Sequence, residues 1–113
     1  MTESSQTLLR YHGRSMWPCF QEGDLLACQP VAPAQVRVGD CIAYRSRDGQ
    51  QVVHRVVARQ KGWLTRGDAL PACDENVVAA DQLLGRVISR HRFGQASSVA
   101  GGIRNGSMAT TRP

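Results

Sequence analysis

Turn-forming residues interrupt this sequence so often that the apolar segments between them are too short for a parallel sheet. Such residues favour loops because they impose or tolerate backbone angles that strands do not adopt. In chain order, the turn signals are Pro30, Pro33, Gly39-Asp40, Asp48-Gly49 and Lys61-Gly62. The sequence therefore predicts a mainly β fold, a compact arrangement of short antiparallel strands.

The expected strands are apolar runs that are rich in β-branched or aromatic residues: 25–29, 41–45, 51–59, 63–66 and 85–91. Residues 7–11 are expected either to fray or to form an edge strand. One helical turn is expected near residues 79–84, with Asp81 as its cap. The Asp-Gly pair at 48–49 predicts a two-residue hairpin turn.

The length of 113 residues fits one domain. Composition divides the chain into an N-terminal segment (1–10), a folded domain (11–92) and a flexible tail (93–113). The tail is rich in Gly, Ser and Thr, so it offers little apolar surface to offset the entropy lost on ordering.

Charge and composition limit the expected partners and location. The net charge is +5, but the Arg residues are scattered, and the aromatic content of 5% supplies few side chains for stacking on nucleic-acid bases. Nucleic acid is therefore not an expected partner. No apolar segment is long enough to span a membrane, and no secretory signal is recognisable. We expect a cytoplasmic protein or one peripheral to a membrane, and association with a membrane surface stays open.

The four cysteines are expected to be reduced, partly buried thiols. Cys19, Cys28, Cys41 and Cys73 form no C-x-x-C pair, and no His lies at zinc-finger spacing from them. Neither a metal nor another cofactor is expected.

Three segments carry residues suited to acyl transfer. Ser15 follows Gly13 in a turn, where it could present its hydroxyl together with its own backbone N–H. His54 lies within a β-branched run, and its imidazole could act as a general base. Asp68 and Asp74 lie in a polar loop, and either could orient that imidazole. Singly, each is more typical of an ordinary turn or strand residue.

Together, in this order and spacing, these segments resemble the type I signal peptidases and the related self-cleaving LexA-like and UmuD-like proteins. The resemblance covers residues 11–90. The matching segments are 13–18 with Gly23-Asp24 for the nucleophile box, 38–44 and 85–88 for two strands, 54–57 for the general-base box, and 65–68 with Asp74 for the last box.

The resemblance implies a signal peptidase-like or LexA-like β fold and a serine endopeptidase that cleaves an extended peptide or precursor protein. Bacterial-type members pair Ser with Lys, whereas archaeal and endoplasmic-reticulum types use His and Asp. His54 stands at the general-base position here, and Lys61 lies seven residues further on, which is about 23 Å along a strand. The implied roles are Ser15 as nucleophile, His54 as base, Asp74 as the orienting acid and Asp68 as a supporting acid.

The sequence also departs from the family, which leaves alternatives open. Gly13 stands where the family often has a Ser whose hydroxyl assists the oxyanion hole, so only backbone N–H groups are expected there. The membrane anchor of the family is not recognisable. One alternative is self-cleavage, for which the bond at Ala100-Gly101 is the best candidate. Another is a non-catalytic β-module that binds extended peptides.

Overall fold

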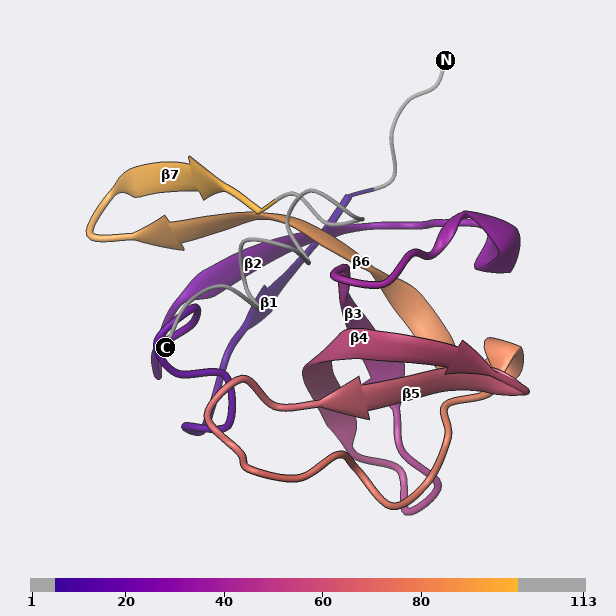
Figure 1. Ribbon diagram of the computed structural model, residues 1–113. Helices are drawn as coiled ribbons and strands as arrows, with labels where there is room; N and C mark the ends of the chain where they lie inside the picture. The colour runs from indigo at the N-terminus through magenta and orange to yellow at the C-terminus, as the bar shows by residue number, and fades with distance from the viewer. Residues whose placement is uncertain (1–5, 100–113) are drawn as a thin grey trace.

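Seven β-strands form one antiparallel sheet in the computed structural model, which describes residues 6–99 (Figure 1). They are β1 (Thr7–Arg10), β2 (Leu25–Gln29), β3 (Cys41–Arg45), β4 (Gln51–Gln60), β5 (Gly62–Arg66), β6 (Leu83–Arg92) and β7 (Gln95–Ser98). The strands pair in the order β1-β2-β6-β3-β4-β5, and β7 pairs with β6. The prediction of a mainly β fold of antiparallel strands is confirmed.

The predicted strand positions agree closely with the structure, and the two 3-10 turns are η1 (Pro33–Gln35) and η2 (Ala80–Gln82). The element η2 lies where a helical turn was expected, but Asp81 does not cap it. Instead, the Ala79 N–H donates to Gln82 Oε1 at 2.8 Å. Because both helical elements are single turns, no helix within residues 6–99 is long and apolar enough to cross a membrane.

The predicted two-residue hairpin turn between β3 and β4 is wrong. The strands pair only as far as Arg45 opposite Gln51, so the connection contains residues 46–50. Ser46 closes this wider loop, because its N–H donates to the Gln50 carbonyl at 2.7 Å and its hydroxyl accepts the Gln50 N–H at 3.0 Å. A four-residue turn, in which the Gly49 N–H donates to the Ser46 carbonyl at 2.9 Å, together with the Ser46 side chain thus replaces the predicted two-residue turn.

The prediction of a flexible tail is wrong for residues 95–98, which form β7 and pair with the last four residues of β6 (Figure 1). Backbone pairing with β6 orders this polar segment, and Arg90 adds a hydrogen bond of 3.1 Å from its guanidinium to Ser97 Oγ. Residues 7–10, which the sequence left as frayed or an edge strand, form the edge strand β1. Residues 1–5 and 100–113, including Ala100-Gly101, lie outside the described residues.

The sheet buries apolar side chains in two clusters, and β4 contributes to both. The first cluster comprises Tyr11, Met16, Phe20, Leu26, Cys28, Cys41, Ala43, Val53 and Val87. The second comprises Val36, Ile42, Tyr44, Val56, Trp63 and Val78, with Val52 packed against it. Successive side chains of a strand point to opposite faces, so β4 directs alternate residues into alternate clusters.

The loop between β1 and β2 (residues 11–24) is anchored in the first cluster. Met16 and Phe20 are fully buried, and the backbone of Tyr11 exchanges hydrogen bonds with Gly23 and Asp24 at the other end of the loop. Asp24, itself only 2% exposed, accepts two hydrogen bonds from Arg92 of β6 at 2.7 and 2.8 Å. The loop is therefore fixed to the sheet at both ends and in its centre.

The ion pair between Asp24 and Arg92 predicts that the fold loses stability at low pH. The hydrogen bonds from Arg92 lower the pKa of the Asp24 carboxyl below its ordinary value of 3.8. A carboxyl whose pKa is lower in the folded state than in the unfolded state stabilises the fold. This stabilisation is complete above the pKa of the unfolded state and is lost as the pH falls through the pKa of the folded state. We expect Asp24→Asn to lower the Tm at pH 7 by about 5–10 °C.

This Tm difference should begin to shrink as the pH falls below 3.8, where the unfolded carboxyl is protonated, and should disappear only below the lower folded-state pKa, where the folded carboxyl is protonated as well. Thermal unfolding of both proteins, followed by circular dichroism over a series of pH values, measures it. A difference that stays constant down to the acid limit contradicts the role given to the Asp24 carboxylate.

Candidate active site

Ser15 and His54, which are 39 positions apart in the chain, meet through their side chains. Ser15 Oγ lies 3.1 Å from His54 Nε2, which is hydrogen-bond distance. Ser15 is half-buried in the 11–24 loop, directly before the buried Met16. His54 is 8% exposed and comes from the middle of β4. A buried neighbour and a paired strand thus hold the two side chains in place.

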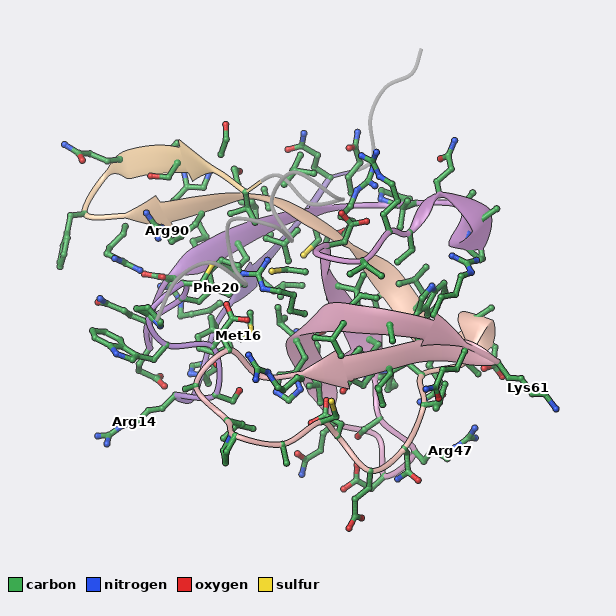
Figure 2. The ribbon with its side chains drawn as sticks, viewed as in Figure 1. Arg14, Met16, Phe20, Arg47, Lys61 and Arg90 are labelled. Carbon is green, nitrogen blue, oxygen red and sulfur yellow. The ribbon has the colours of Figure 1, made fainter. Side chains whose placement is uncertain are left out.

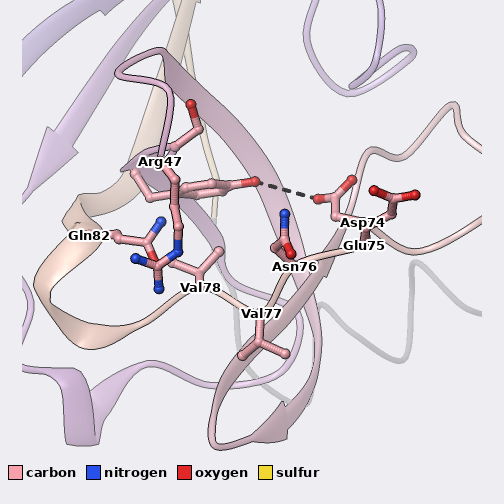
Figure 3. A pocket seen from close by; sticks show the side chains of 9 residues that line it. Arg47, Asp74, Glu75, Asn76, Val77, Val78 and Gln82 are labelled. Atoms are coloured by element: carbon pink, nitrogen blue, oxygen red, sulfur yellow. Dashed lines mark hydrogen bonds between the residues drawn. The ribbon is translucent and has the colours of Figure 1, made fainter.

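The second ring nitrogen of His54 lies against Asp74. His54 Nδ1 and Asp74 Oδ2 are 2.6 Å apart, and the same oxygen accepts a hydrogen bond of 2.6 Å from Thr65 Oγ1. Tyr44 donates to it over a longer distance of 3.5 Å, the contact marked in Figure 3. When the carboxylate holds the proton on Nδ1, Nε2 is left free to accept the Ser15 proton.

Contacts with β5 hold Asp74 level with His54 of β4. The chain leaves β5 at Arg66 and returns, and the Asp74 N–H then donates to the Thr65 carbonyl at 2.8 Å. Thr65 therefore contacts Asp74 with both its backbone and its side chain. This double contact positions the Asp74 carboxylate beside His54.

Asp68, the other predicted acid, contacts Arg55 instead of His54. The Arg55 guanidinium donates to both oxygens of Asp68 at 2.8 Å, and it also donates to the Gly39 carbonyl at 2.7 Å. Burial is the largest single influence and disfavours the Arg55 charge, but the hydrogen bonds with Asp68, added to the negative charges of Asp68 and the two nearby cysteines, raise the Arg55 pKa. His54 and Arg55 are consecutive strand residues, so their side chains point to opposite faces and each takes a different carboxylate.

The turn after β5 packs directly on the backbone of Ser15. The Ala69 N–H donates to the Ser15 carbonyl at 2.8 Å, and the Asp68 N–H donates to Met16 Sδ at 3.4 Å. A Cβ on Gly67 would lie 2.6 Å from the Ser15 carbonyl oxygen and 3.0 Å from Ser15 Cβ. Only glycine allows the two loops to approach this closely.

The backbone N–H groups around Ser15 are unequally available to an oxyanion. The Gly13 N–H donates to Glu22 Oε1 at 2.6 Å, and the Met16 N–H donates to the Tyr11 hydroxyl at 3.0 Å. The Ser15 N–H donates to no group among the described residues 6–99. Of these three donors, only the Ser15 N–H is free to hold a developing negative charge.

A cleft of about 390 Å³ opens in front of Ser15 and His54. Its walls are formed by the end of β1 with the start of the 11–24 loop, and by the first half of β4: Leu9, Arg10, Tyr11, His12, Ser15, Gln51, Val52, Val53 and His54. Within residues 6–99, β1 pairs only with β2, and the part of β4 before Arg55 pairs only with β3. Two unpaired strand edges therefore border the cleft.

Asp74 also lines a second, smaller pocket, which Figure 3 shows with Arg47, Glu75, Asn76 and Gln82 around it. Neither Ser15 nor His54 lines this pocket. Within residues 6–99, no group of three or more His, Cys, Asp or Glu side chains is arranged to hold a metal ion.

Lys61 lies far from the site. It occupies the exposed turn between β4 and β5, and Figure 2 shows it across the molecule from Arg14 and Met16, the two neighbours of Ser15. The only lysine of the chain is thus not placed to activate Ser15.

All four cysteines have free thiols, and two of them lie near the Arg55–Asp68 pair. The hydrogen bond with Cys41 lowers the pKa of the Cys19 thiol to about 7, with a further contribution from the charge of Arg55. The same hydrogen bond, together with burial, raises the pKa of Cys41. A thiol with a lowered pKa is the more reactive kind, so a labelling experiment has to separate reaction at Cys19 from reaction at Ser15.

Sequence reasoning missed three residues that support the site: Tyr11, Thr65 and Gly67. Tyr11 and Thr65 hydrogen-bond to Ser15 and Asp74 respectively, and Gly67 provides room for Ser15. Thr65 and Gly67 belong to the segment that resembles the last family box, so their position in the sequence indicated that they lie near the site. Nothing in the sequence indicated Tyr11.

The contact between Gly67 and Ser15 predicts the effect of adding one methyl group. Gly67→Ala would force the two loops apart, and we expect it to destabilise the fold by about 1–3 kcal/mol. Urea unfolding of the full chain measures this loss. Gly49→Ala serves as a comparison: Gly49 has no atom within 4 Å of the added Cβ, so its cost arises only from its positive φ of 89°. An unchanged free energy of unfolding in Gly67→Ala contradicts the close packing.

Comparisons of this chain with protein-family models, with curated proteins and with solved structures find no match.

Proposed function

We propose that this chain is a serine endopeptidase of the signal peptidase-like type that works by a Ser-His-Asp mechanism. The observation that carries the proposal is a continuous line of hydrogen bonds from Ser15 Oγ through His54 to Asp74, at 3.1 and 2.6 Å. This line begins in a cleft that a peptide could enter. The resemblance of residues 11–90 to the signal peptidases supports the same reaction.

In the first step, Ser15 Oγ attacks the scissile carbonyl carbon while its proton moves to His54 Nε2. The carbonyl oxygen becomes an oxyanion, and the free Ser15 N–H is the donor available to it. Asp74 stabilises the imidazolium without taking its proton. His54 then protonates the leaving amine, and the acyl group stays on Ser15 until water, activated by the same imidazole, removes it.

The substrate is an extended peptide or a segment of a precursor protein. The unpaired edges of β1 and β4 on the two sides of the cleft offer backbone N–H and C=O groups to such a chain. A peptide that pairs with them adds a strand to the sheet, a mode in which backbone hydrogen bonds supply affinity and side-chain pockets supply specificity.

The proposal predicts that Ser15→Ala and His54→Ala each lower cleavage by about a thousandfold or more while the fold stays intact. Neither side chain is a large apolar part of the core, so circular dichroism and Tm should stay close to those of the wild type. The assay incubates the full chain with a diverse mixture of synthetic peptides and identifies new termini by mass spectrometry. A variant that cleaves at near wild-type rate contradicts the assigned mechanism.

The two acids provide a matched pair of variants. Asp74→Asn is expected to lower the rate at least about a hundredfold, because the amide no longer fixes the His54 tautomer. Asp68→Asn should lower stability, because it leaves the half-buried Arg55 without its carboxylate, and should lower the rate by less than about tenfold.

The same assay separates the alternative functions. If wild-type protein binds peptides but produces no new termini, the non-catalytic module is the better reading. If the protein shortens itself and leaves added peptides intact, self-cleavage is the better reading.

A further inference from the structure

We infer that Tyr11 is a positioning residue for the nucleophile: its hydroxyl fixes the Ser15 hydroxyl in the orientation that delivers the proton to His54. This inference rests on the proposed function, because it assigns a role in the same reaction. The contact that carries it is the distance of 3.1 Å between the Tyr11 hydroxyl oxygen and Ser15 Oγ.

Tyr11 is held rigidly where β1 ends and the 11–24 loop begins. Its N–H donates to the Asp24 carbonyl and its carbonyl accepts the Gly23 N–H, both at 2.8 Å. Its ring packs on Phe20 with centroids 5.9 Å apart, and the residue as a whole is 5% exposed. A side chain constrained at both its backbone and its ring can direct its hydroxyl with little freedom.

The surrounding hydrogen bonds determine the direction of the Tyr11 proton. The Met16 N–H donates to the Tyr11 oxygen at 3.0 Å, so this oxygen already accepts one bond. The tyrosine proton is then free to be donated to Ser15 Oγ. A hydroxyl carries only one proton, and that of Ser15 is directed to the nearest remaining acceptor, His54 Nε2, at 3.1 Å.

These contacts form one ordered chain in which every donor has one acceptor. It runs from the Met16 N–H through the Tyr11 and Ser15 hydroxyls to His54, and ends at Asp74. Without the Tyr11 hydroxyl, Ser15 Oγ could rotate toward water in the cleft and lose its alignment. Tyr11 thus supplies, from the start of the same loop, a hydroxyl beside the nucleophile at a site where Gly13 has no side chain.

The test measures inactivation of the full chain by a fluorophosphonate, which reacts covalently with an activated serine. Peptide mapping by mass spectrometry assigns the adduct to Ser15 and separates it from any reaction at Cys19. For Tyr11→Phe we expect the maximal inactivation rate to fall about tenfold, the effect of losing one hydrogen bond to the nucleophile. The reagent concentration at half-maximal rate should stay unchanged, because the cleft is intact.

Tyr11→Phe also removes the acceptor of the Met16 N–H, so a second measurement separates this structural loss. The Tm decrease caused by Tyr11→Phe is compared in the wild type and in the Ser15→Ala background. The loss of the Met16 bond contributes equally to both. The loss of the contact with Ser15 contributes only to the first, so the decrease should be larger in the wild type. Equal decreases overturn the inferred hydrogen bond.

Each outcome of the labelling experiment is decisive. Wild-type labelling at Ser15 with slow labelling of Tyr11→Phe supports the inference. If both proteins react at the same rate, the role of Tyr11 is wrong and the proposed peptidase function stands. If the wild type acquires no adduct at Ser15, the proposed function fails, and the role of Tyr11 in catalysis fails with it.

Discussion

The alternation of side chains along β4 is the constraint on which the site depends. His54 and Arg55 are neighbours in the strand, so they must face opposite sides, and each meets its own carboxylate. Asp74 lies on the face of β4 that carries the imidazole, and Asp68 lies on the face that carries the guanidinium. A shift of register by one residue would exchange the two faces and separate His54 from both Ser15 and Asp74. The pairing of β4 with β3, Ile42 opposite His54, therefore fixes the chemistry as well as the fold.

Two loops bring the remaining groups to β4, and each is held by contacts that extend beyond the site. The 11–24 loop is anchored by Met16 in the first cluster and by Asp24 on β6. The turn after β5 then packs on the Ser15 backbone, where Gly67 leaves no room for a side chain. The hydrogen bonds of the site are thus the endpoints of a packed arrangement, and in the proposed mechanism a Ser15 hydroxyl held in this way would need little reorganisation before attack.

The sequence predicted most of the strands, because alternation and turn residues are local signals. It failed where local signals compete with contacts made after folding: Ser46 closes a wider loop than the Asp-Gly pair suggested, and β7 is ordered by pairing with β6. The grouping of Ser15, His54 and an Asp was expected from the resemblance of their segments to the signal peptidases. Which acid faces His54 depends on strand register and on Thr65, and the contact of Tyr11 with Ser15 depends on how the 11–24 loop folds. Such non-local geometry cannot be read from residue types.

The assignment of Asp74 to His54 is the central claim, and proton NMR of the imidazole tests it most directly. A proton held between His54 Nδ1 and a carboxylate 2.6 Å away should give a resonance far downfield of the backbone amides. We predict that this resonance is present in the wild type, is retained in Asp68→Asn and is lost in Asp74→Asn. Its absence from the wild type, or its loss in Asp68→Asn with retention in Asp74→Asn, would contradict the account.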